Sequence, residues 1–181
     1  MTVAIASCGP ASAVTTTTGT ETSVSPPVSS STTTIASVPT CGGSDLDVSV
    51  GTIEGAAGST FTTILFENVG DGDCRLTGHP SVSYAASDGG EVVGESAVPS
   101  DQPSVSVLLT PGDQASAVLR QAQPANFPED RCAPVQVWGL RVSLPGQSVP
   151  VYLGHTTTAC STGQDGRPSI SVIQAGTDPT F

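Results

Sequence analysis

From Cys41 onward, apolar and polar residues alternate repeatedly with a period of two, and helical spacing is scarce. Leu46-Asp47-Val48-Ser49-Val50 places three aliphatic side chains on one face of an extended chain and its two polar residues on the other. The segment from Thr60 to Asn68 has the same character, and we expect Ile64 and Phe66 to point inward. This pattern predicts half-buried β-strands, because a period of two directs every second side chain to one face of a sheet.

Turn-forming residues separate these segments at short intervals. Asp88-Gly89-Gly90, Thr110-Pro111-Gly112-Asp113 and Pro145-Gly146 are typical turn sequences, because glycine accepts positive φ angles and proline fixes φ. The turns delimit about eight short strands, which is the spacing of a β-sandwich. We therefore predict an all-β fold, an immunoglobulin-like antiparallel β-sandwich. The segment 113–123 also has a helical composition, but its place after a Pro-Gly turn favours a strand.

Two further expectations concern the second half of the chain. Residues 126–130 lie among prolines at 124 and 128, and we expect an irregular loop there. Trp138 is the single tryptophan, and we expect it to be a core anchor that packs near a disulfide, as in many sandwiches. A role in stacking on a ligand is the alternative for Trp138.

The first forty residues differ in composition from the rest. Between Gly9 and Thr40, 21 of 32 residues are Ser, Thr or Pro, and Glu21 is the only charged one. Such a segment buries too little apolar surface to offset its ordering entropy. We predict a disordered linker over residues 9–40, a β-sandwich domain over residues 41–175 and a short tail over residues 176–181.

Ile5-Ala6-Ser7-Cys8 resembles a bacterial lipobox, in which an aliphatic residue and two small residues precede a lipid-modified cysteine. This resemblance implies that Cys8 carries a diacylglycerol anchor and that residues 1–8 hold the remnant of a lipoprotein signal peptide. Residues 1–7 contain neither a basic start nor the apolar run that such a signal needs, so we expect the natural start to lie upstream. The alternative is that Cys8 is an ordinary thiol.

The other four cysteines are Cys41, Cys74, Cys132 and Cys160, and they allow three pairings. We favour Cys41–Cys74 with Cys132–Cys160, because this pairing closes two separate loops. The spacing fits a zinc site poorly, since no C-x-x-C occurs. Disulfides form in oxidising compartments, so this pairing goes with a location outside the cytoplasm.

Charge excludes several classes of function. The chain has 5 Lys and Arg residues against 16 acidic ones, for a formal net charge of −11, and all five cations are arginines. The missing lysine removes Schiff-base, P-loop and Ser-Lys chemistry. A strongly acidic protein repels phosphate backbones, so we expect no nucleic acid partner. It also disfavours anionic lipid heads, so we expect membrane contact only through the anchor.

No local motif indicates a catalytic, cofactor or metal site, and we predict none. The sequence lacks G-x-S-x-G, G-x-G-x-x-G and P-loop patterns. His79 and His155 are most simply exposed loop histidines. A hydrolase of envelope material acting through His79 or His155 is one alternative function. A metal carrier that uses both histidines and a carboxylate is the other.

Three motifs occur in order and together resemble a known family. They are Asn68-Val69-Gly70, Cys74-Arg75-Leu76-Thr77-Gly78-His79-Pro80 and Leu109-Thr110-Pro111-Gly112, followed by the later Cys132. This set resembles an actinobacterial domain-of-unknown-function family catalogued with the number 4232, found in secreted proteins and lipoproteins. The resemblance covers about residues 41–173. His79 departs from the pattern, since we would expect an aromatic residue before the proline.

The resemblance implies a disulfide-bonded β-sandwich behind a Ser/Thr-rich linker at an actinobacterial cell surface, and it implies no activity. Its motif residues are interpreted as scaffold. We therefore expect a cell-envelope lipoprotein with a non-enzymatic binding or accessory domain, without cofactors, whose partner is an envelope protein or glycan. We expect a monomer on the outer face of the cell membrane, or a secreted protein if the lipobox is not used.

Overall fold

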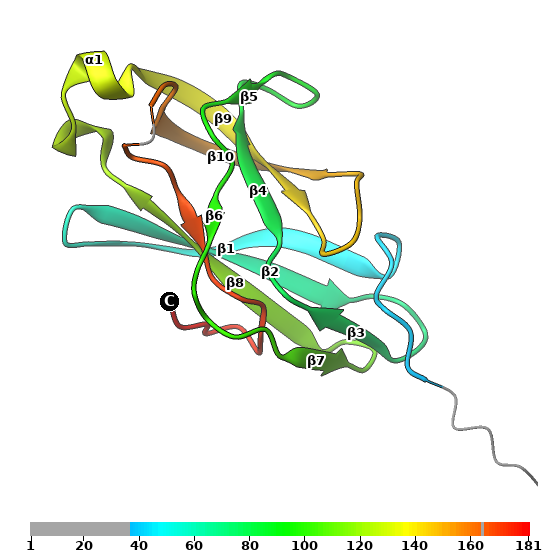
Figure 1. Cartoon of the computed structure of the whole chain (residues 1–181). Coiled ribbons are helices and arrows are strands. Elements are labelled where there is room, and N and C mark those ends of the chain that lie inside the picture. Colours follow the sequence, from blue (N-terminus) through cyan, green and yellow to red (C-terminus); the bar gives the residue numbers. More distant parts are fainter. Residues whose placement is uncertain (1–36, 164) are drawn as a thin grey trace, which may run out of the picture. The chain divides into compact units, whose positions relative to one another are not determined.

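The computed structural model describes residues 37–163 and 165–181. Their elements, in chain order (Figure 1), are β1 (Leu46–Ala56), β2 (Ser59–Asn68), β3 (Cys74–Thr77), β4 (Ser81–Ala85), β5 (Val92–Val93), β6 (Val98–Pro99), β7 (Ser106–Leu109), β8 (Gln114–Ala122), the 3₁₀ turn η1 (Pro124–Asn126), α1 (Glu129–Cys132), β9 (Pro134–Ser143), β10 (Val151–Cys160), β11 (Ser169–Ile170) and β12 (Gln174–Ala175). Cys8 and linker residues 9–36 lie outside the described residues.

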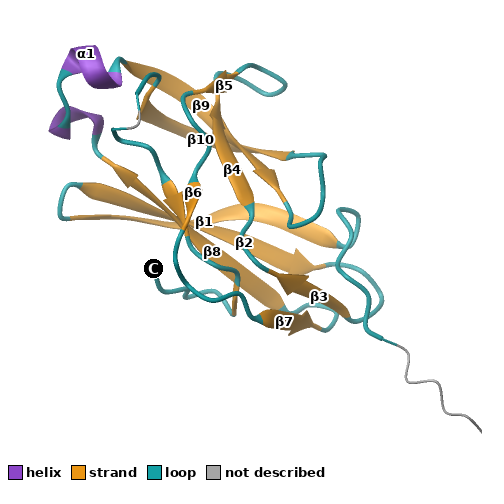
Figure 2. Ribbon diagram, viewed as in Figure 1, coloured by secondary structure: helices purple, strands orange, loops and turns teal. Residues whose placement is uncertain are grey.

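The strands form a sandwich of two facing sheets, as Figure 2 shows. One sheet has six strands in the order β1-β2-β8-β11-β6, with β12 also paired to β8, and the other has four in the order β10-β9-β4-β5. A small third sheet joins β3 to β7. Within the described residues, eight strands have four residues or more, β1 to β4 and β7 to β10. The predicted all-β sandwich is confirmed, although β6 and β11 pair in parallel.

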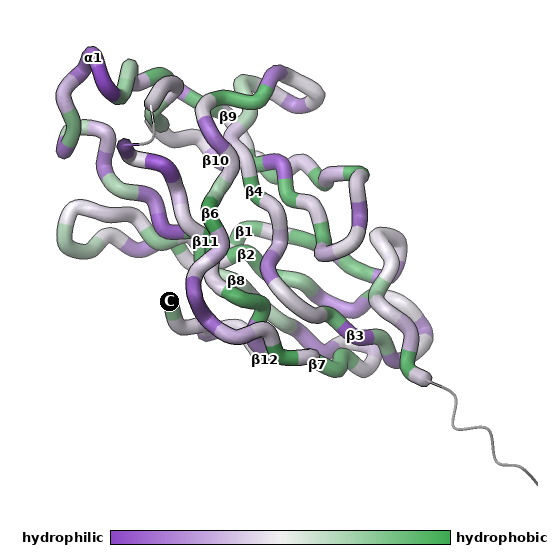
Figure 3. The backbone as a smooth tube through the Cα atoms, in the orientation of Figure 1, coloured by the Kyte–Doolittle hydropathy of each residue, from purple (hydrophilic) through white to green (hydrophobic). Residues whose placement is uncertain are grey.

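The residues predicted to point inward from the period-two pattern lie in the core. Ile64 and Phe66 of β2 are fully buried, and their cross-strand partners Ala117 and Ala115 of β8 are buried as well. Segment 113–123 is the strand β8, paired with β2 from Ser59 to Glu67, so the choice of strand over helix is confirmed. Figure 3 shows hydrophobic positions recurring along these strands between hydrophilic ones.

Trp138 does not anchor the core, so that prediction is wrong. Its side chain is 53% exposed, whereas Val137 and Leu140 on the same strand are fully buried. The pairing of β9 with β10 shifts register between Gly154 and Thr157, opposite Trp138. A register shift of this kind changes which residues of a strand face the core. The buried positions are therefore Leu140, Gly139 and Val137, and Trp138 faces solvent.

The expected irregular loop over residues 126–130 is also partly wrong, because this stretch enters two short helical turns. Pro124 begins η1, where its missing N–H costs nothing. Pro128 caps the four-residue α1, which ends at Ala133 in a left-handed conformation with φ 42°. No helix in the described part of the chain has the length and hydropathy needed to cross a membrane.

Two disulfides staple opposite parts of the domain, in the pairing favoured from the sequence. Cys41–Cys74 has a Cα–Cα distance of 4.8 Å and ties the start of the domain to β3. Backbone hydrogen bonds from Arg75 to Pro39 and from Cys41 to Arg75 extend this attachment. Cys132–Cys160 has a Cα–Cα distance of 4.5 Å and ties α1 to the end of β10.

Candidate ligand-binding groove

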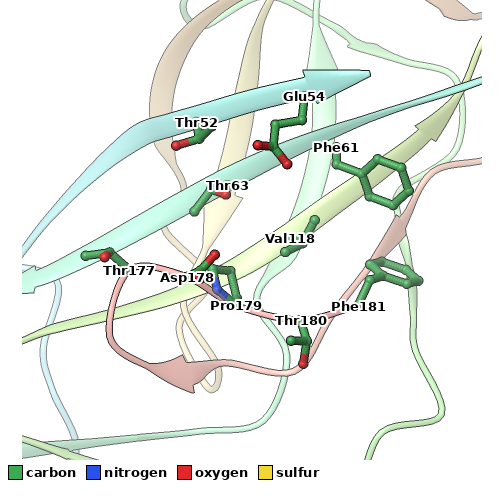
Figure 4. Close-up of a pocket in the computed structure, with 10 residues that line it drawn as sticks. All are labelled: Thr52, Glu54, Phe61, Thr63, Val118, Thr177, Asp178, Pro179, Thr180 and Phe181. Carbon is green, nitrogen blue, oxygen red and sulfur yellow. The ribbon is translucent and has the colours of Figure 1, made fainter. Parts of the chain in front are cut away.

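The outer face of the six-stranded sheet carries the floor of a groove. Since Ile64 and Phe66 point into the core, Phe61 and Thr63 of the same strand point to the opposite face. Glu54 on β1 is the cross-strand partner of Phe61, and Val118 on β8 is the partner of Thr63. Neighbouring strands therefore set a carboxylate, a phenyl ring and a hydroxyl side by side (Figure 4).

The tail, residues 176–181, returns over this face and forms the wall of the groove. The ring of Phe181 meets the ring of Phe61 edge to face, with centroids 6.3 Å apart and an interplanar angle of 75°. The space between tail and sheet is about 350 Å³. Its lining comprises Thr52, Glu54, Phe61, Thr63, Val118, Thr177, Asp178, Pro179, Thr180 and Phe181. We call this space the tail groove.

Hydrogen bonds to the sheet hold the tail in place. Gly176 reverses the chain with φ 84°, a conformation that favours glycine. Its N–H donates to the Gln114 carbonyl, 2.8 Å away, and its carbonyl accepts from the Ser116 hydroxyl at 2.6 Å. Further along, the Gln174 side chain donates to the Thr180 carbonyl at 2.6 Å and accepts from the Thr180 N–H at 3.2 Å. The wall is therefore fixed at two points.

Several polar groups in the tail groove have no partner among the described residues. The hydroxyls of Thr52, Thr63 and Thr177 and the carboxylates of Glu54 and Asp178 make no hydrogen bond or ion pair there. A pocket with apolar walls and a few convergent polar groups is the usual form of a small-molecule site. A volume of about 350 Å³ lies at the lower end of the range for such sites, roughly 300–1,000 Å³.

A second depression of about 410 Å³ lies where η1 and α1 meet β9 and β10. Its lining is Gln123, Pro124, Ala125, Phe127, Glu129, Pro134 and Thr158. The Gln123 amide is already hydrogen-bonded to Thr60. The lining of this depression includes one carboxylate and one phenyl ring, whereas the lining of the tail groove includes two carboxylates and two phenyl rings. We therefore take the tail groove as the candidate site.

His155 is not the exposed loop residue that the sequence led us to expect. It lies on β10 and is 9% exposed, at an inward position two residues after the buried Leu153. Desolvation by this burial lowers the pKa of His155 below its ordinary value. The buried imidazole occupies an inward position on β10 instead of an exposed position in a loop.

His79 is half-buried in the loop between β3 and β4, with its Nε2 3.4 Å from Ser100 Oγ. The Ser100 hydroxyl donates to Gln102 Oε1, which also accepts the Val172 N–H. While the Ser100 hydroxyl hydrogen points to Gln102, His79 Nε2 can interact with Ser100 only as a donor. That arrangement is not the one of a general base, which accepts the proton of the nucleophile.

The carboxylates and histidines of the described residues form no evident metal centre. No group of three or more His, Cys, Asp or Glu side chains in residues 37–163 and 165–181 is placed to hold an ion. Asp45 instead caps a turn, where its Oδ2 accepts the Gly42 N–H at 2.7 Å. The Asp45 carboxylate thus stabilises the turn by accepting a backbone hydrogen bond.

The sequence motifs beside the groove-bearing sheet meet at one junction. The buried Asn68 side chain donates to the carbonyls of Gly72 and Leu109, at 2.9 and 3.0 Å, and accepts the Gly70 N–H at 3.0 Å. Its backbone carbonyl accepts the Gly112 N–H at 2.8 Å. One asparagine thus joins the N-x-G motif to the L-x-P-G turn, and these residues act as scaffold.

A family model described as domain of unknown function (DUF4232) matches residues 41–174, more than half of the chain. The chain belongs to this family. No curated protein matches the chain. In this DUF4232 domain, the matched span contains both disulfides, the Asn68 junction and the floor of the tail groove.

The tail groove was missed from the sequence. Outward positions of a half-buried strand are normally polar, so a phenylalanine at such a position is unusual. Phe61 is the signal that could have pointed to this face, because it alternates with the inward Ile64 and Phe66 and faces the other way. The tail residues carry no comparable signal, since they follow the last strand without a periodic pattern.

Proposed function

We propose that this DUF4232 protein is an extracytoplasmic lipoprotein, anchored through Cys8, whose β-sandwich binds another component of the cell envelope without catalysing a reaction. The tail groove carries the proposal, because hydroxyls and carboxylates without a hydrogen-bond partner among the described residues line the same groove as two phenyl rings. Strand pairing fixes the floor of the groove, and the hydrogen bonds of Gly176 and Thr180 hold its wall.

The anchor and the location rest on the lipobox-like residues before Cys8 and on the disulfides. Disulfides of a small domain persist in oxidising compartments and are rare in reducing ones. The Ser/Thr/Pro-rich linker, residues 9–40, then serves as the tether between anchor and domain.

Expression from the natural gene tests the anchor. The wild-type protein should sediment with membranes and carry a diacylglycerol thioether on Cys8, and Cys8→Ser should release it into the soluble extracytoplasmic fraction. The four domain cysteines should react with a thiol probe only after reduction. Four free thiols and an unmodified Cys8 in the native product would refute both the anchor and the oxidising location.

Binding is tested with the full chain carrying Cys8→Ser, which keeps the domain intact and removes the lipid. The probe is the insoluble envelope fraction of the organism that encodes the protein. Saturable sedimentation of the protein with this fraction is the expected result. Binding no greater than that of an unrelated acidic protein of similar size would refute the proposed role.

A further inference from the structure

We infer that the tail groove binds a neutral carbohydrate, presented as a glycan chain of the envelope. This inference rests on the proposed function, because it names the ligand class of the same groove.

The two rings supply the apolar part of such a site. Phe181 is 44% exposed, and Phe61 is half-buried, although both are phenyl groups with no polar handle of their own. Both rings line the groove, and Figure 4 shows them against each other at one end of it. A sugar ring presents an apolar C–H face of similar width, and its packing removes apolar surface from water.

The polar groups select the rest of the ligand. The carboxylate oxygens of Glu54 and Asp178 accept hydrogen bonds, and the threonine hydroxyls both donate and accept. A ligand that satisfies them must therefore bring several donors together with acceptors. Sugar hydroxyls do both, and a hydroxyl that donates to a carboxylate makes a charge-assisted bond, which is stronger than a neutral one.

Charge argues against an acidic ligand. The groove lining contains two carboxylates and no Arg or Lys. Arg120 is the exposed cross-strand partner of Phe61, but it lies outside the lining. Uronates or phosphates in the groove would face Glu54 and Asp178, and like charges repel. A neutral glycan avoids that repulsion. The net negative charge of the whole chain also disfavours an acidic ligand.

Sedimentation with the envelope fraction tests the inference on natural material. The envelope is treated either with periodate, which cleaves the vicinal diols of sugars, or with protease. We expect binding of the Cys8→Ser chain to survive protease treatment and to be lost after periodate treatment. Binding that is lost only after protease treatment would overturn the carbohydrate assignment while leaving the proposed envelope-binding function standing.

Variants place the binding in the groove. Phe181→Ala should weaken binding about tenfold, because it removes one apolar wall without opening the core. Asp178→Asn, which conserves shape, should weaken it about fivefold through loss of a charge-assisted bond. Trp138→Ala is the matched control, an exposed aromatic residue of the other sheet, and should bind like the parent chain. Unchanged binding in both groove variants, with melting temperatures equal to the parent, would overturn the inference.

Titrations with defined probes identify the charge class. Maltohexaose, cellohexaose and mannohexaose serve as neutral glycans, hexagalacturonic acid as an acidic one, and choline as a cation that two rings and two carboxylates would attract. In nitrogen-15 NMR, at least one neutral hexasaccharide should shift the amide signals of Thr63 and of the non-proline tail residues Thr177, Asp178, Thr180 and Phe181. Tighter binding of the uronate or of choline than of every neutral glycan would overturn the assignment to neutral carbohydrate.

Discussion

Replacing Asn68 by alanine should destabilise the domain by about 3 kcal/mol, because three side-chain hydrogen bonds are lost at about 1 kcal/mol each. Those bonds join the carbonyls of Gly72 and Leu109 and the N–H of Gly70 to a side chain that is 1% exposed. Such a loss is a large part of the stability of a typical domain, about 5–15 kcal/mol.

Urea unfolding followed by circular dichroism measures the effect, with the disulfides intact and the full Cys8→Ser chain as parent. Asn126→Ala is the matched control, since the Asn126 amide also donates to a carbonyl, that of Gly58, but at an exposed position. The control should lower the free energy of unfolding by less than about 1 kcal/mol. If Asn68→Ala lowers the free energy of unfolding by no more than Asn126→Ala does, at an unchanged m-value, then the Asn68 junction does not stabilise the domain as argued.

Asn68→Asp extends the same test to pH. A carboxylate at this site keeps the bond from the Gly70 N–H but faces the Gly72 and Leu109 carbonyls without a donor. Burial and those carbonyls raise the pKa of an aspartate above its value in the unfolded chain, about 3.9. The variant should therefore be most stable below pH 4 or so and lose stability as the pH rises through its folded-state pKa. Asn68→Ala should lack this pH dependence.

Three further results are expected. Replacing Cys132 and Cys160 by alanine should cost about 3.5 kcal/mol in urea unfolding, as a loop of 28 residues is released in the unfolded chain. Burial raises the pKa of Tyr84, so thermal stability should fall above pH 10, where the unfolded chain ionises first, and Tyr84→Phe should reduce this fall. Trp138→Ser should cost less than about 1 kcal/mol, whereas Leu140→Ala should cost about 2–5 kcal/mol.

Local pattern was enough to predict the strands whose inward positions follow a strict period of two. Ile64 and Phe66 are buried because β2 keeps its alternation from Thr62 to Asn68. The Asp88-Gly89-Gly90 turn likewise joins β4 to β5, with Tyr84 opposite Val93. In such segments the side-chain direction follows from the backbone geometry alone, so burial can be inferred without knowing the neighbouring strands.

Trp138 and His155 show where that inference fails. Both lie at the register shift between β9 and β10, and a shift depends on how two strands pair. Hydrophobicity alone favours Trp138 as the buried residue. Because of the register shift, however, Val137 is buried instead of Trp138, and the more polar His155 is also buried. The register between two strands cannot be inferred from the alternation within one strand. Burial predicted from β9 alone was therefore wrong at Trp138.

The tail groove depends on several contacts outside the strand that forms its floor. Outward positions such as Phe61 can be identified from alternation, but alternation does not say whether another segment covers that face. The cover exists because β12 pairs with β8, Gly176 reverses the chain and Gln174 holds Thr180 against the sheet. The pairing of β12 with β8 joins residues that are distant in sequence, whereas the Gly176 turn and the Gln174–Thr180 bonds are local. A groove that requires the long-range pairing has no local signature. The scaffold of this domain is therefore visible in its motifs, whereas the proposed binding surface arises only from the tertiary contacts that bring Phe181 to Phe61.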